Sequence, residues 1–229
     1  MQIKNFFRYI TSFIWGYSFE KISTEVNPTL EVCYVNGKTI LNAANVNYSY
    51  GSCEVAFNKI FKKLNIKEKN INKVLILGFG VGCIAHLLEN VYQKEAKIIG
   101  IEKDKVIIEL GAKYFNTLKF INVSIICDDA IHYIEENTEQ FDLIIVDLFV
   151  DYVVPEKCEQ EQFLNHIKRS LALEGLLVFN KLEMNIQTNS TLEALKSSFK
   201  QVMPEFTIHQ LYQDEPNYMF AYINSSLSA

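Results

Sequence analysis

The chain has 229 residues, of which 49% are hydrophobic and 21% charged, with only 9 glycines and 4 prolines. This balance excludes collagen-like and largely disordered proteins and predicts one sizeable folded core. The 22 basic and 27 acidic residues give a formal net charge of −5. Because the sequence also lacks a dense run of lysine and arginine, we expect no nucleic-acid partner.

The cysteines and histidines predict neither a disulfide framework nor a metal site, because the five cysteines are widely spaced and form no ligand spacing with the four histidines. This pattern is typical of a reducing compartment, so we expect a cytoplasmic protein. No apolar run reaches the ~18–20 residues needed to span a bilayer, and no membrane span is expected.

The first residues are rich in aromatic side chains. Arg8, Thr11 and Ser12 interrupt the apolar stretch, which argues against a secretory signal. The apolar residues recur at helical spacing and predict a helix with one apolar face. We expect this face to pack on the protein body or on a second subunit, as in a homodimer, with attachment to a membrane surface as the alternative. The face comprises Phe6, Phe7, Ile10, Phe13, Ile14 and Tyr17.

The next segment predicts a hairpin followed by a helix. Asn36-Gly37 separates the apolar stretches 30–35 and 38–41, and both turn residues tolerate positive φ in a type I′ turn. Residues 53–64 show helical periodicity. We therefore expect residues 1–70 to form an N-terminal helix and β-hairpin extension.

Residues 71–229 predict a doubly wound α/β domain, because short apolar runs at 73–78, 97–101, 123–127, 142–147 and 175–179 alternate with helical patterns. The runs 206–212 and 218–223 are joined too tightly for parallel pairing, so we expect the last strand to be antiparallel to the others. Three helices are expected between the strands. The first has Ile84, Leu87, Leu88 and Val91 on one face, the second is capped by Asp104, and the third has Phe163, Ile167 and Leu171 on one face.

The turn after the first strand carries three glycines, Gly78, Gly80 and Gly82. Glycine lets a ligand approach the backbone beside exposed helix N–H groups. Position 83 is a cysteine, so the dinucleotide pattern G-x-G-x-x-G is not met. The spacing G-x-G-x-G favours a nucleoside ligand without a pyrophosphate.

Acidic residues end the following strands, where they face one crevice. Glu102 could accept hydrogen bonds from a ribose; its alternative role is to cap a turn. Asp128 and Asp129 precede Ala130 and could bind an adenine amino group or cap the helix that follows. Asp147 follows the apolar run Leu143-Ile144-Ile145-Val146 and needs a partner, which could be a substrate amine or nearby backbone N–H groups.

These motifs, in this order, resemble the class I S-adenosylmethionine-dependent methyltransferases, and within them the spermidine synthase-like branch. The resemblance covers roughly residues 29–223 and includes the hairpin and Tyr48-Ser49-Tyr50-Gly51. It implies a Rossmann-like sheet and an S-adenosylmethionine or decarboxylated S-adenosylmethionine donor, with Asp147 facing the reacting centre as the catalytic acid–base group. The expected donor-binding set is Gly78, Phe79, Gly80, Gly82, Glu102, Lys103, Asp128, Asp129, Ala130 and Asp147, with no metal ligand.

The sequence departs from that branch at two places. Phe79 and Val81 replace a glycine and the acid of the Gly-Gly-Gly-Asp-Gly loop, and Asp151 lies four places after Asp147 instead of three. We therefore expect a methyltransferase that acts on a small molecule. Two alternatives stay open: an aminopropyltransferase that uses the decarboxylated donor, and a non-catalytic nucleoside-binding module.

Overall fold

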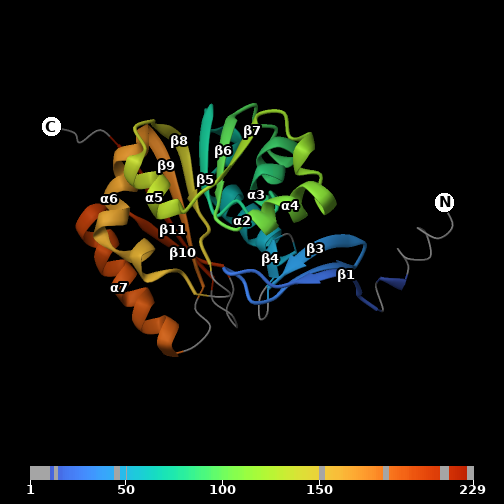
Figure 1. Cartoon of the computed structure of the whole chain (residues 1–229). Coiled ribbons are helices and arrows are strands. Elements are labelled where there is room, and N and C mark those ends of the chain that lie inside the picture. Colours follow the sequence, from blue (N-terminus) through green and yellow to red (C-terminus); the bar gives the residue numbers. More distant parts are fainter. Residues whose placement is uncertain are drawn as a thin grey trace.

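The computed structural model describes residues 11–12, 15–43, 47–49, 51–149, 153–182, 186–211 and 217–225. Its centre is a seven-stranded sheet in the order β10-β11-β9-β8-β5-β6-β7 (Figure 1). The strands are β5 (Lys73–Leu77), β6 (Lys97–Glu102), β7 (Val123–Cys127), β8 (Phe141–Val146), β9 (Leu171–Leu182), β10 (Thr207–Gln210) and β11 (Asn217–Ile223).

The pairing of the strands confirms the predicted α/β fold. Strands β7, β6, β5, β8 and β9 pair in parallel, and β11 pairs antiparallel with β9 and with β10. The carboxyl ends of the five parallel strands therefore share one edge of the sheet, which is where the predicted site residues follow them.

Helices cover both faces of this sheet, with α2, α3 and α4 on one side and α5, α6 and α7 on the other (Figure 1). Two separate apolar clusters fill the two layers, one around Phe57 and Ile76 and the other around Phe163 and Phe179. The helices are α2 (Ser52–Lys63), α3 (Cys83–His86), α4 (Lys105–Tyr114), α5 (Ala130–Glu136), α6 (Glu161–Ser170) and α7 (Ile186–Val202). The 3₁₀ helices are η1 (Ile66–Glu68), η3 (Thr117–Lys119) and η4 (Glu156–Glu159), and a π-helix, η2 (Leu87–Val91), follows α3 directly.

A second, four-stranded antiparallel sheet precedes α2, in the order β1-β2-β3-β4. The predicted hairpin is confirmed: Asn36 and Gly37 have φ values of 52° and 75°. Leu30, Val32 and Leu41 of this sheet are buried against Val81, Ile107 and Leu110, which brings the extension onto the glycine turn. Its strands are β1 (Tyr17–Ile22), β2 (Leu30–Val35), β3 (Lys38–Asn42) and β4 (Asn47–Ser49).

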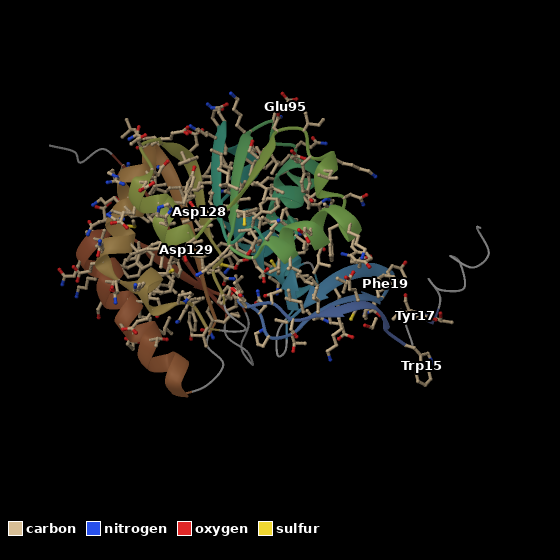
Figure 2. The ribbon with its side chains drawn as sticks, viewed as in Figure 1. Trp15, Tyr17, Phe19, Glu95, Asp128 and Asp129 are labelled. Atoms are coloured by element: carbon tan, nitrogen blue, oxygen red, sulfur yellow. The ribbon has the colours of Figure 1, made fainter. Side chains whose placement is uncertain are left out.

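Some expectations about individual elements are wrong. Tyr17 begins strand β1 instead of continuing an N-terminal helix, because Glu20 of this strand bonds Lys113 and Tyr114 of α4 and β1 completes the small sheet. Figure 2 shows Trp15 extending away from the body, and it is 71% exposed. Val91 is half exposed, and Leu171 opens β9 instead of closing a helix. The predictions for residues 1–10, 13–14, 50, 151 and 212, and for the Tyr48 side chain, lie outside the described residues.

Candidate active site

The glycine turn needs glycine for steric reasons. Gly78, Gly80 and Gly82 have φ values of 86°, 57° and 88°, a region that side chains disfavour. A Cβ on Gly78 would lie 2.2 Å from the carbonyl oxygen of Asp147. The peptide N–H groups of Gly78 and Phe79 both donate to the carbonyl of Ile101, at 3.0 and 2.9 Å. The turn is thus fixed between the ends of β6 and β8.

The two residues between these glycines point into the protein. Phe79 is buried, and its ring occupies the space above Gly100, where a Cβ would lie 2.1 Å away. This leaves only the Phe79 backbone for the predicted donor contact. Val81 is also buried, in the cluster that joins the small sheet to α4.

Glu102 holds the glycine turn through both carboxylate oxygens. Oε2 accepts the N–H of Gly80 and Oε1 accepts the N–H of Asp104, each at 2.9 Å. The side chain is buried, and this burial raises the pKa of Glu102 to about 7, although both backbone hydrogen bonds oppose the shift. Each carboxylate oxygen can accept a further hydrogen bond, and contact with a ribose stays a prediction.

The acids after β7 are already engaged within the protein. Asp129 caps α5 by accepting the N–H of Ile131 at 2.8 Å, and it pairs with Lys103 Nζ at 2.9 Å. Asp128 bonds the ring of His132. Figure 2 shows both acids beside the same end of the sheet. The capping role that the sequence left open is therefore observed for Asp129, and Ala130 is the first residue of α5.

Asp147 sits at the end of β8, where its N–H donates to the carbonyl of Leu77 at 2.8 Å. Its Oδ1 accepts the side-chain amide of Asn180 at 2.7 Å, and its Oδ2 accepts the thiol of Cys53 at 3.8 Å. Desolvation raises the pKa of Asp147 to about 6, while these two hydrogen bonds act in the opposite direction. A carboxylate with this pKa can accept a proton near neutral pH.

Asn180 is a further candidate site residue, which the sequence analysis missed. It is 6% exposed, and its Oδ1 has no hydrogen-bond partner among the described residues. An unpaired buried carbonyl costs free energy, and an arriving hydrogen-bond donor would remove that cost. The signal available in the sequence was an amide that directly follows the apolar stretch Leu176–Phe179.

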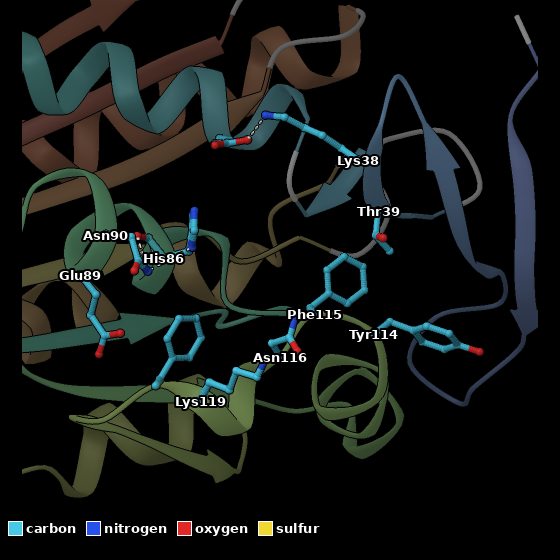
Figure 3. Close-up of a pocket in the computed structure, with 11 residues that line it drawn as sticks. Lys38, Thr39, His86, Glu89, Asn90, Tyr114, Phe115, Asn116 and Lys119 are labelled. Carbon is cyan, nitrogen blue, oxygen red and sulfur yellow. Dashed lines mark hydrogen bonds and ion pairs between the residues drawn. The ribbon is translucent and has the colours of Figure 1, made fainter. Parts of the chain in front are cut away.

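A separate cavity of about 460 Å³ lies between the small sheet, α3 and the segment after α4 (Figure 3). None of the predicted donor-binding residues lines it, but Phe120 of its wall approaches Gly82, where a Cβ would lie 2.8 Å from the ring. Its other lining residues are Lys38, Thr39, Glu54, His86, Glu89, Asn90, Tyr114, Phe115, Asn116 and Lys119.

The described residues contain no cluster of three or more His, Cys, Asp or Glu side chains that could hold a metal ion. No helix in this part of the chain is both long and apolar enough to cross a membrane.

Comparison with known proteins assigns the chain to a family. The model of the spermine/spermidine synthase domain matches residues 58–226. The chain belongs to this family. Its sequence is 31% identical to a polyamine aminopropyltransferase of Alkaliphilus metalliredigens and 25% identical to one of Vibrio vulnificus, over 67% and 68% of this chain and 55% and 51% of theirs. The chain thus spans about half the length of these relatives.

The fold of this spermine/spermidine synthase-family chain also matches solved structures. Spermidine synthase from Thermotoga maritima superimposes with a TM-score of 0.71 and 14% identity, over 91% of this chain and 73% of that one. Human methyltransferase-like protein 13, solved with SAH, superimposes with a TM-score of 0.60 and 16% identity, over 77% and 82%. At these identities the two likenesses support the Rossmann-like methyltransferase fold alone.

Proposed function

We propose that this chain is an aminopropyltransferase that uses decarboxylated S-adenosylmethionine and a small amine. The observation that carries the proposal is the pair formed by Asp147 and Asn180, which offers an amine a carboxylate of raised pKa beside an unpaired amide carbonyl. The family match and the curated relatives favour aminopropyl transfer over the methyl transfer expected from the sequence.

The donor would lie over the glycine turn, with its ribose on Glu102. Gly78, Gly80 and Gly82 present backbone without a Cβ, and Glu102 keeps acceptor capacity on both oxygens. Asp129, with Lys103 and Ala130 beside it, would border the adenine. Because Asp129 already caps α5 and pairs with Lys103, it would bind the adenine amino group through the remaining lone pairs of its carboxylate oxygens.

The reaction is a displacement at carbon. The amine nitrogen attacks the methylene carbon bound to the sulfonium, a C–N bond forms as the C–S bond breaks, and the sulfur leaves with the electron pair as a thioether. The proton lost by the nitrogen passes to Asp147. The protein supplies alignment, worth up to ~7–11 kcal/mol in well-oriented reactions, and a general base.

Methyl transfer is the second candidate, and Val81 is the observation that favours it. The spermidine synthase-like branch has an acid at this loop position, whereas Val81 is buried among Leu30, Ile107 and Leu110. The residue therefore offers no carboxylate to the amino group of the decarboxylated donor.

Calorimetric titration with decarboxylated S-adenosylmethionine, S-adenosylmethionine and NAD tests the proposal. We expect the decarboxylated donor to bind more tightly than S-adenosylmethionine, and NAD to give no heat of binding. Preference for S-adenosylmethionine would support methyl transfer instead. Binding of NAD alone would contradict both candidates.

A further inference from the structure

A second buried amide carbonyl without a hydrogen-bond partner among the described residues lies on β11, the strand next to that of Asn180. Asn217 is the first residue of β11, is 7% exposed, and its Oδ1 has no hydrogen-bond partner among the described residues. Asn180 and Asn217 are the two residues with such an atom in this part of the chain. Both lie at the edge of the sheet that carries the glycine turn.

The strand register places both amides on one face. Met219 pairs with Asn180 and Asn217 pairs with Leu182, so Asn217 lies two residues along β11 from the partner of Asn180. In an antiparallel pair, two directly paired residues point to the same face, and so do residues two positions apart on one strand. Asn180 and Asn217 are therefore diagonal neighbours on one face, and such neighbours lie about 7–8 Å apart. Met219 packs in the cluster on the α2 side, so this is the face from which Cys53 reaches Asp147.

The opposite face carries the nearby positive charge. Lys181 and Tyr218 pair with each other and alternate with the two asparagines. Lys181 is buried, forms an ion pair with Glu159 and donates to Thr191 at 2.9 Å. Its ammonium therefore does not compete for the carbonyls of Asn180 and Asn217.

We propose that Asn217 determines substrate specificity by accepting a hydrogen bond from the far end of the amine substrate, whose reacting end lies at Asp147 and Asn180. The proposal rests on the proposed function. A neutral carbonyl accepts from an ammonium or from a hydroxyl group. The ligand class is thus a linear alkyl amine with a second N–H or O–H donor at its other end.

Three amines of equal carbon number differ in the group at the far end of the chain, which is an amine, a hydroxyl group or a methyl group: 1,4-diaminobutane, 4-amino-1-butanol and 1-aminobutane. We expect kcat/KM and calorimetric affinity for the two bifunctional amines to exceed those for 1-aminobutane about tenfold or more. Asn217→Leu and Asn217→Ala should both reduce this preference about tenfold. Because each removes an unpaired acceptor, the Tm of Asn217→Leu should not fall, whereas a structural role would lower it.

Ile223→Leu is the matched control, since Ile223 lies at the other end of β11 and is 40% exposed. It should keep the wild-type preference. If the wild type uses all three amines equally, or if both Asn217 variants keep its preference, the role of Asn217 is wrong and the proposed function stands. If no amine is bound or turned over, the proposed function itself is wrong.

Discussion

The side-chain amide of Asn180 donates to Oδ1 of Asp147 at 2.7 Å, across the neighbouring strands β9 and β8. This bond directs the amide nitrogen to the carboxylate and turns the amide carbonyl away from it. The same bond therefore orients two different acceptors: a carboxylate that can take up a proton and a neutral carbonyl that can accept a hydrogen bond.

Replacing Asp147 with asparagine should separate activity from stability. Asp147→Asn removes the proposed base, so kcat/KM should fall by roughly 10²–10⁴. The native state raises the pKa of Asp147 from 3.8 to about 6, so it holds this proton more tightly than the unfolded chain. The free energy of unfolding of the wild type therefore falls as pH rises from about 4 to about 6, whereas that of Asp147→Asn does not fall for this reason. Thermal unfolding at pH 8 should give a Tm no lower than that of the wild type.

The pH dependence of kcat/KM should report Asp147. We expect activity to rise with pH through about 6, because the base must be deprotonated. Asn180→Leu removes a hydrogen bond to the charged form, so the pKa of Asp147 and the acidic limb of the profile should move to higher pH. The matched change Asn224→Leu, at an amide that bonds the carbonyls of Leu171 and Ala172, should leave the limb in place. An unmoved limb in Asn180→Leu would show that another group titrates.

Removal of the Glu102 carboxylate should weaken donor binding. Glu102→Ala loses the acceptors for Gly80, Asp104 and the proposed ribose, and the affinity should fall by about 1.5–3 kcal/mol. Glu102→Gln keeps the shape and one acceptor oxygen, so its loss should be smaller. Calorimetry with S-adenosylmethionine measures both variants, and equal affinity in all three proteins would remove Glu102 from the site.

Phe79→Leu should act on stability more than on donor binding, because the ring packs against Gly100 in the core. We expect a loss of about 1–2 kcal/mol in the free energy of unfolding, measured in urea. The donor affinity should change less than in Glu102→Ala. A larger loss of affinity than in that variant would mean that the ring itself contacts the ligand.

The sequence predicts those parts of this fold that depend on local patterns. The turn at Asn36-Gly37, the Asp104 cap and the apolar strands each carry a short-range signal, and all three are observed. Tyr17, the first residue of β1, was assigned to a helix because it continues a helical spacing, whereas the pairing of β1 with β2 is a tertiary interaction. Helix α7 (Ile186–Val202) was not predicted.

The candidate site was only partly predictable for the same reason. Acids that end strands are visible in a sequence, so Glu102 and Asp147 could be proposed as site residues. Asn180 and Asn217 are single amides in apolar strands, and only the register of β9 with β11 shows that they share a face. Likewise, nothing in the letters Gly78-Phe79-Gly80 shows that the phenylalanine turns inward to fill the space above Gly100.

The most direct test is the identity of the product. The protein is incubated with decarboxylated S-adenosylmethionine and 1,4-diaminobutane, and in a parallel mixture with S-adenosylmethionine and the same amine. The masses of the products are measured by mass spectrometry. We predict an amine enlarged by one aminopropyl group, together with methylthioadenosine, in the first mixture. A methylated amine in the second mixture alone, or no new amine in either, would contradict the account.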